Sequence, residues 1–213
     1  HLLGYLKGSA THALKFILDK RDFEEPLKNM KVVLQTDASH AGCTETRRST
    51  AGYCVELRGT HGTHAVVSWG VKKLSLIALS SCEAEVFAAT LGSKQSIFVK
   101  MLLDGLLGIS NNAMPRFGEF NADYPDTLGI PQTLEMDASA ALIAIRKGSS
   151  TKIRQVRRSL GVSLAWLHAQ WHGNSNNNTA HVKGTHLKAD ALTKTLDRTK
   201  HTTFSAEFGL APP

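Results

Sequence analysis

Acidic residues stand in four short segments of this chain, each where a strand is expected to end or a helix to begin. The segments read Thr36-Asp37-Ala38-Ser39, Ser80-Ser81-Cys82-Glu83-Ala84-Glu85, Leu134-Glu135-Met136-Asp137 and Lys188-Ala189-Asp190-Ala191. Carboxylates brought from distant segments into one cleft repel each other, and a divalent metal ion is the usual reason for such an arrangement. A single Asp near a strand end more often forms a turn or caps a helix, so only the joint pattern favours chemistry. That pattern predicts a metal-dependent nuclease.

Two glutamates compete for the second acidic position, because both lie at the start of the same expected helix. Ser80 and Glu83 fit a capping box, in which the glutamate side chain accepts a hydrogen bond from the amide of the cap residue. Glu85 lies about 200° further around the helix, so the two carboxylates cannot share one face. The face of Glu85 continues with small residues that allow close approach to a sheet: Ala88, Ala89 and Gly92. Glu85 is therefore the better catalytic candidate.

The elements that must position these acids can be predicted from the apolar patterns between them. In the first half we expect a largely helical segment over 1–20, a connector over 20–28, strands over 30–36, 48–58 and 64–69, and a long helix over 81–107. In the second half we expect a connector over 109–131, a strand over 132–137, helices over 138–147 and 151–171, an Asn-rich loop over 173–179, a strand over 179–183 and a helix from about 187. The first three strands should form a meander. If the fourth strand lies beside the first, Asp37 and Asp137 meet where the chain order of an α/β sheet reverses, which is where such sheets bind ligands.

Composition limits the class of protein. The 213 residues suffice for one sizeable core, and 25 Lys and Arg against 18 Asp and Glu give a net charge of +7. That excess favours a polyanionic partner, since cationic patches release counterions from phosphates, although a merely soluble basic protein would also show it. Three cysteines without a CxxC pair, no signal peptide and no apolar run of membrane-spanning length predict an intracellular protein that is not secreted and has no membrane partner. The start at His1 rather than Met predicts a piece of a longer polypeptide.

Further motifs follow one another in a fixed order. They read Asp37-Ala38-Ser39, Arg47-Arg48-Ser49-Thr50-Ala51-Gly52-Tyr53, Ser68-Trp69, Lys72-Lys73, Ala78-Leu79-Ser80-Ser81-Cys82-Glu83-Ala84-Glu85 and Ala189-Asp190-Ala191-Leu192-Thr193-Lys194. Together they resemble the ribonuclease H domain of copia-type retrotransposon polyproteins, and the resemblance covers roughly residues 1–200. The stretch from His1 to Gly8 is similar to the end of the reverse transcriptase that precedes that domain, whereas the polymerase motif Y-x-D-D is missing.

The resemblance implies a ribonuclease H-like fold, which is a five-stranded mixed sheet flanked by helices, with an N-terminal helical appendage. It divides the chain into a reverse transcriptase remnant or connection at 1–29, a ribonuclease H-like domain at 30–200 and a C-terminal tail at 201–213. The implied activity is endonucleolytic cleavage of the RNA strand of RNA–DNA hybrids with two Mg²⁺ ions, Mn²⁺ being possible, in a cytoplasmic reverse-transcription particle. The partners would be the hybrid and other parts of the parent polyprotein or a larger assembly.

The four acids of the family pattern correspond to Asp37, Glu85, Asp137 and Asp190, as catalytic residues and metal ligands. Glu85 rather than Glu83 matches the family pattern E-x-x-A through Ala88. Two bound metal ions activate the attacking water and stabilise the departing 3′ oxygen. We expect Asp37 to bridge both ions, Glu85 and Asp137 to complete the shell of one, and Asp190 to complete that of the other.

Basic residues could hold the hybrid through phosphates and 2′-hydroxyls without reading bases. The candidates are Arg47, Arg48, Lys72, Lys73, Lys152 and Arg154. A solvated hairpin explains Arg47 and Arg48 equally well, so both interpretations of that pair stay open. The segment from Lys152 to Arg158 fits an exposed helix face better than a dedicated clamp.

An alternative function follows from departures from the family pattern. His40 stands where the family usually has Trp, Ala138 where it has Asn, and Gln155 near an expected His. These changes would suit an inactive or domesticated copy that acts as a nucleic-acid-binding or structural subunit. His181 or His186 precedes Asp190, where some ribonucleases H have a loop histidine that aids product release. His168 and His172 have a spacing that can bind zinc, but no further ligand stands nearby in the sequence.

Overall fold

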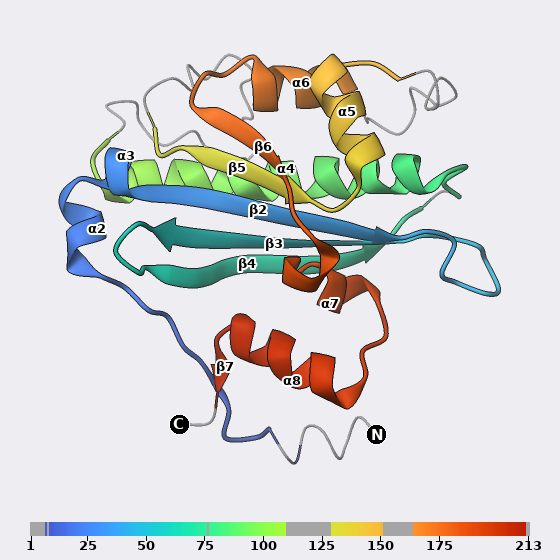
Figure 1. Ribbon diagram of the computed structural model, residues 1–213, viewed down its shortest axis with the longest axis horizontal. Coiled ribbons are helices and arrows are strands. Elements are labelled where there is room, and N and C mark those ends of the chain that lie inside the picture. Colours follow the sequence, from blue (N-terminus) through green and yellow to red (C-terminus); the bar gives the residue numbers. More distant parts are fainter. Residues whose placement is uncertain (1–6, 8, 76, 110–128, 151–163, 212–213) are drawn as a thin grey trace.

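The main feature of the computed structural model is one five-stranded sheet with the strand order β4-β3-β2-β5-β6 (Figure 1). Residues 7, 9–75, 77–109, 129–150 and 164–211 are described. The strands are β2 (Met30–Ser39), β3 (Thr50–Gly59), β4 (His64–Lys73), β5 (Gln132–Met136) and β6 (Asn177–His181). β2, β3 and β4 form an antiparallel meander, whereas β5 lies parallel to β2 and β6 parallel to β5. The predicted α/β fold, with the fourth strand beside the first, is confirmed, although β6 begins two residues earlier than expected.

The helix α4 (Ser81–Leu106) runs along one face of the sheet (Figure 1). Its small residues allow a close approach: a Cβ atom on Gly92 would lie 2.8 Å from side-chain atoms of Leu34 and Thr36. The cap of α4 differs in one detail from the expectation. Ser80 Oγ accepts from the Glu83 amide at 3.1 Å, but the Glu83 carboxylate accepts from the Leu79 amide at 2.7 Å instead of from Ser80. Glu83 therefore has the structural role that the sequence predicted, with a different partner.

Two further helices, α5 (Ser139–Lys147) and α6 (Leu164–His172), pack against each other and against α4 (Figure 1). The buried Trp171 indole donates a hydrogen bond to Ser93 Oγ at 2.9 Å, which joins α6 to α4. Ala138 is the N-cap of α5 and provides no side-chain hydrogen bond to its first turn. The expected connector over 109–131 and the first half of the expected helix over 151–171 lie outside the described residues, apart from their ends.

The C-terminal part forms shorter elements than the sequence predicted. A 3₁₀ turn η4 (Gly184–His186) is followed by α7 (Asp190–Thr193), α8 (Arg198–Glu207) and β7 (Leu210–Ala211). The helix expected from about 187 begins only at Asp190, because the preceding segment is tied to the sheet: the Lys188 amide donates to Gln35 Oε1 at 2.7 Å.

The expected N-terminal helix over 1–20 is wrong between residues 12 and 19. These residues are extended and include β1 (Ala13–Leu14), and two short helices follow, α2 (Lys20–Glu24) and α3 (Pro26–Asn29). The physical reason is that distant backbone groups compete for this segment. The Lys15 amide donates to the Gly209 carbonyl at 2.8 Å, and Ile17 exchanges two backbone hydrogen bonds with His64, at 2.8 and 3.1 Å.

The two outer segments of the chain meet, because β1 pairs antiparallel with β7 below the main sheet (Figure 1). The division into 1–29, 30–200 and 201–213 stays a prediction, and α8 runs across its second boundary. None of the helices among the described residues is both long enough and apolar enough to cross a membrane.

Candidate active site

Two of the four acids are aligned by the register of neighbouring parallel strands. Gln35 of β2 lies opposite Glu135 of β5, and Asp37 and Asp137 each follow two residues later. Because side chains alternate along a strand, an equal offset places both acids on the same side of the sheet. Asp37 is buried inside β2, two residues before that strand ends, whereas Asp137 is half-buried just beyond β5.

The third acid comes from the far end of the sequence. Asp190 is the first residue of α7, and α7 contacts β2 and β3. Asp37, Asp137 and Asp190 each have a carboxylate oxygen within 4.8 Å of the others, close enough for one cation to bind all three. Burial, and then the charge of Asp37, raise the pKa of Asp190 to about 6.

Glu85 faces the same cluster from α4. The Ala38 amide donates to Glu85 Oε1 at 3.3 Å, but Oε2 is buried and has no hydrogen-bond partner among the described residues. Burial raises the pKa of Glu85 to about 8, and the neighbouring charges of Asp37 and Asp137 add to this effect. A buried carboxylate oxygen without a donor, facing other carboxylates, fits a divalent cation, since hard oxygen ligands suit Mg²⁺ and Mn²⁺.

Two polar groups at the acid cluster were not singled out from the sequence. The Thr193 hydroxyl donates to Asp37 Oδ2. Lys194 Nζ lies 2.6 Å from Asp190 Oδ1 and 3.3 Å from Asp37 Oδ1. Their signal was the spacing of three and four residues from Asp190, which places side chains on one helix face.

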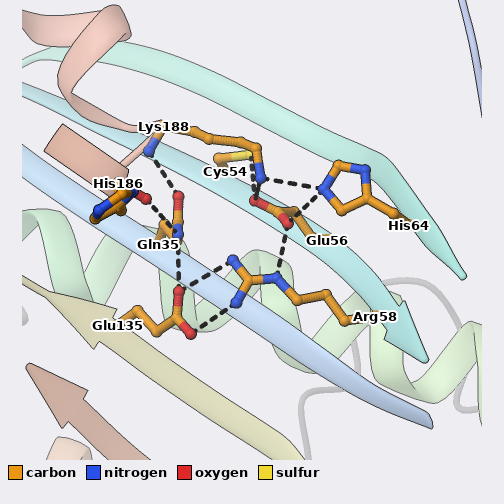
Figure 2. A network of polar contacts seen from close by, with 8 residues as sticks. All are labelled: Gln35, Cys54, Glu56, Arg58, His64, Glu135, His186 and Lys188. Atoms are coloured by element: carbon orange, nitrogen blue, oxygen red, sulfur yellow. Dashed lines mark hydrogen bonds and ion pairs between the residues drawn. The ribbon is translucent and has the colours of Figure 1, made fainter. Parts of the chain in front are cut away.

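A polar network holds the segment before Asp190 against the sheet (Figure 2). Lys188 is buried, and its Nζ pairs with Glu56 Oε1 of β3 at 2.7 Å. Glu56 is fully buried, and its Oε2 also accepts a hydrogen bond from Arg58 Nε at 2.9 Å. His64 Nε2 lies 3.2 Å from the same oxygen. Burial opposes ionisation of Glu56, but the charges of Arg58 and Lys188 outweigh it and lower the pKa of this carboxyl group.

The same network continues across β2 to β5 (Figure 2). Gln35 Nε2 donates to Glu135 Oε2 at 2.7 Å and to the His186 carbonyl at 3.3 Å. Arg58 donates to both oxygens of Glu135, at 2.8 and 3.1 Å. His186 and Lys188, on the two sides of Leu187, are thus fixed to β2 and β3, and Lys188 lies two residues before Asp190. This network was not predicted, because its members are scattered through the sequence without a motif.

Comparison with known proteins identifies the kind of chain to which this site belongs. No protein-family model matches it. The chain is 38% identical over 71 residues to the retrovirus-related Pol polyprotein from transposon TNT 1-94 of Nicotiana tabacum, which covers 33% of this chain and 5% of the polyprotein. This sequence similarity agrees with two observations on the structure, the strand order of the sheet and the convergence of acids from four segments. The chain has a ribonuclease H-like fold and is similar in sequence to part of a retrotransposon polyprotein.

Two other relatives of this ribonuclease H-like domain show similar sequence identity. The uncharacterized mitochondrial protein AtMg00810 of Arabidopsis thaliana is 36% identical over 92 residues, covering 42% of this chain and 32% of that protein. The secreted RxLR effector protein 161 of Plasmopara viticola is 34% identical over 98 residues, covering 46% of this chain and 60% of that protein. The chain thus spans less than two thirds of the length of each of these three relatives.

Solved structures with a similar arrangement include ribonuclease H1 of Halobacterium salinarum and the ribonuclease H domain of prototype foamy virus (PFV). The first is 13% identical with a TM-score of 0.43 and covers 76% of this chain and 93% of the other. The second is 15% identical with a TM-score of 0.44 and covers 84% of this chain and 96% of the other. The ribonuclease H-like fold is assigned from this chain's own strand order, β4-β3-β2-β5-β6.

Four of the six basic candidates of the ribonuclease H-like domain lie at the end of the sheet that carries Asp37. Arg47 and Arg48 are exposed in the loop between β2 and β3, and Lys72 and Lys73 are exposed at the end of β4. Ala51 pairs with both Ala38 of β2 and Lys72 of β4, which places these charges near the acids. Lys152 and Arg154 lie outside the described residues.

The candidate histidines of the ribonuclease H-like domain separate into two groups. His181 Nε2 lies 3.0 Å from the Asp137 carbonyl oxygen, so this side chain borders the acid cluster. His186 contributes its backbone carbonyl to the polar network. His168 and His172 stack at 5.8 Å between ring centroids. His168 Nδ1 lies 3.2 Å from the Ile145 carbonyl oxygen, and the described residues bring no acid or cysteine to this pair as a metal-binding group.

Proposed function

We propose that this chain cleaves the RNA strand of RNA–DNA hybrids endonucleolytically, as part of a retrotransposon polyprotein during reverse transcription. The observation that carries the proposal is the convergence of Asp37, Glu85, Asp137 and Asp190 from four distant segments, with one buried oxygen of Glu85 unpartnered among the described residues. An acidic cluster on an α/β sheet has many uses, but an unsatisfied buried carboxylate oxygen is costly unless a cation completes it.

The four acids would hold Mg²⁺, or Mn²⁺ in its place, and Asp37 is central because β2 is the middle strand. Two such ions would supply the activated water and neutralise charge on the phosphate and the leaving oxygen. The chain itself contributes the placement of the acids: β2 and β5 align Asp37 with Asp137, α4 presents Glu85, and the segment fixed by Lys188 presents Asp190.

The exposed cations Arg47, Arg48, Lys72 and Lys73 would contact phosphates of the hybrid, because they stand at the same end of the sheet as the acids. Lys152 and Arg154 stay candidates from the sequence. Recognition through phosphates and 2′-hydroxyls needs no base contacts, which suits cleavage without a fixed sequence. Residues 1–29 would be the connection to the preceding polymerase.

The test is cleavage of labelled hybrid, duplex DNA and single-stranded RNA, each with Mg²⁺ and with chelator. We expect cleavage of the hybrid only, with Mg²⁺ only. Asp37→Asn should lower the rate more than roughly a hundredfold, the scale of losing one key electrostatic group in an active site, and keep the fold by circular dichroism. Glu25→Gln, at an exposed ion pair with Lys28, is the matched control and should leave the rate unchanged. Full activity of Asp37→Asn would disprove the metal role.

A second candidate is an inactive copy that acts as a nucleic-acid-binding or structural module. The ion pairs of Lys194 with Asp37 and Asp190 favour it, because an internal cation can neutralise acids without a metal. Thermal melting separates the two candidates. A metal site raises the melting temperature by mass action, whereas no shift at millimolar Mg²⁺ would support the inactive module.

A further inference from the structure

Lys194 connects two acids that come from different elements. It directly follows α7, four residues after Asp190, and its Nζ lies 2.6 Å from Asp190 Oδ1 and 3.3 Å from Asp37 Oδ1. In the ion pairs of the described residues, Asp37 and Asp190 have Lys194 as their sole partner. The side chain of Lys194 is 44% exposed, whereas that of Asp37 is 2% exposed. Lys194 is thus a cation that reaches from solvent into a buried acidic site.

The single charge of Lys194 is too small to neutralise the acidic cluster that it contacts. One ammonium group provides a single positive charge, while four carboxyl groups converge here, and Glu85 Oε2 has no donor among the described residues. The two oxygens bonded to Lys194 belong to Asp37 and Asp190, which are candidate metal ligands. The Lys194 ammonium group bonded to these oxygens repels any metal ion that approaches them, because both are positively charged. A metal and Lys194 therefore compete for the same oxygens.

We propose that Lys194 is an intramolecular counter-ion: it holds the acids together in the metal-free protein and is displaced when divalent metal binds. The proposal depends on the metal site of the proposed function and adds a regulatory element to it. The exposed stem of Lys194 allows the ammonium group to swing out to water, where its hydration compensates for the broken ion pairs. The metal-free protein gains stability from Lys194, and the metal-bound protein gives up part of its affinity for that reason.

The test compares Lys194→Met, which keeps the length and apolar character of the stem, with the wild-type chain. Binding of Mn²⁺ alone, without nucleic acid, is measured by calorimetry, and stability is measured by thermal melting in chelator. We expect Lys194→Met to bind Mn²⁺ more tightly, by roughly tenfold, which corresponds to about 1.4 kcal/mol, and to melt at a lower temperature without metal. A residue with a merely structural role would lower both metal affinity and stability, so the opposite directions of the two changes are diagnostic.

Two further variants keep the test decisive. Lys28→Met removes an exposed charge that pairs with Glu25 before β2 begins, at the opposite end of that strand from Asp37, and should change neither quantity. Lys194→Gln, which can still donate a hydrogen bond, replaces Lys194→Met if the latter does not fold. Equal or weaker Mn²⁺ binding by the Lys194 variants, with normal binding by the wild type, would overturn the counter-ion role alone. Failure of the wild type and of all variants to bind Mn²⁺ would overturn the proposed function as well.

Discussion

At the scale of single residues, the carboxyl group of Glu85 has a strongly raised pKa. It is nearly closed off from solvent at 6% exposure, and burial followed by the charges of Asp37 and Asp137 raises its pKa to about 8. At neutral pH and without metal this group therefore keeps its proton. A bound divalent cation would reverse that preference by favouring the ionised form.

The raised pKa of Glu85 predicts how stability depends on pH in chelator. The folded chain holds the proton up to about pH 8, whereas the unfolded chain releases it near the ordinary glutamate pKa of 4.5. The unfolded state therefore binds fewer protons in this window, and stability should fall as pH rises from about 4.5 to about 8. Asp190, with a pKa of about 6, adds to the fall at the acidic end. Urea unfolding in chelator at a series of pH values measures this slope.

Replacing Glu85 by Gln should remove most of that slope above pH 6 and make the metal-free variant more stable than wild type at pH 8. Glu83→Gln is the matched control, because the Glu83 carboxylate accepts a hydrogen bond from the Leu79 amide at the helix cap. This variant should leave the slope near pH 8 in place. If both variants showed the same slope as wild type, Glu85 would not be the group that titrates.

Residues of the candidate site were predictable to different degrees. Glu85 could be separated from Glu83 because helix geometry and capping chemistry are local, and the structure gives Glu83 its cap role. Thr193 and Lys194 were not predicted as contacts of Asp37, since they lie 156 and 157 positions away in the chain. No local rule relates residues at that separation.

At the scale of elements, the position of α7 depends on the polar network beneath it rather than on α7 itself. A helix of four residues is too short to be stable alone. The preceding segment is fixed by the pairing of Lys188 with Glu56 and by the Lys188 amide on Gln35. These contacts lie on the side of the sheet that also carries Asp37.

Lys188→Met should be strongly destabilising, by roughly 3 kcal/mol or more, because it leaves the buried carboxylate of Glu56 with one cation fewer. The double variant Lys188→Met with Glu56→Gln should recover part of this loss, since no unpaired charge remains. Urea unfolding at pH 7 measures both changes, and Lys31→Met, at an exposed position of β2, is the control. A loss for Lys188→Met as small as that of the control would show that the network contributes little.

The helices and strands differ in how accurately their bounds could be predicted from local sequence. The long helix α4 was predicted to within one residue and β3 to within two, because apolar periods and turn residues mark them. The strands β2 and β4 begin where predicted but run three and four residues further. The segment around Leu14 to Leu18 was predicted as helix from its apolar residues. It is extended because Gly209 and His64 supply backbone partners from far along the chain. Propensity is a weak signal when tertiary hydrogen bonds compete with it.

At the scale of the whole molecule, a net charge of +7 coexists with a cluster of acids. Under the proposed function, the exposed cations next to the acids would bind the phosphates of a hybrid, and the unneutralised acids would repel them. Salt should therefore weaken hybrid binding, because each phosphate contact releases counterions.

Arg48→Ala combined with Lys72→Ala should weaken hybrid binding and make the plot of log affinity against log salt less steep, by roughly 1 for each phosphate that is no longer neutralised. Fluorescence anisotropy of labelled hybrid in chelator measures the slope without cleavage. Lys28→Ala combined with Lys31→Ala removes the same charge at the opposite end of β2 and should have little effect. Equal slopes for the two pairs would mean that net charge, and not this patch, binds the hybrid.

The sequence by itself determined the strand pattern and the long helix, because both depend on local periodicity. It also predicted the four acids and the choice of Glu85 over Glu83, from capping, motif spacing and the resemblance to a family. Only the tertiary structure decided the register that aligns Asp37 with Asp137, the reach of Lys194 into the cluster, and the buried pairing of Lys188 with Glu56. These contacts join residues that are 100 or more positions apart. Their energies depend on burial and on the charges of neighbours, which exist only once the chain has folded.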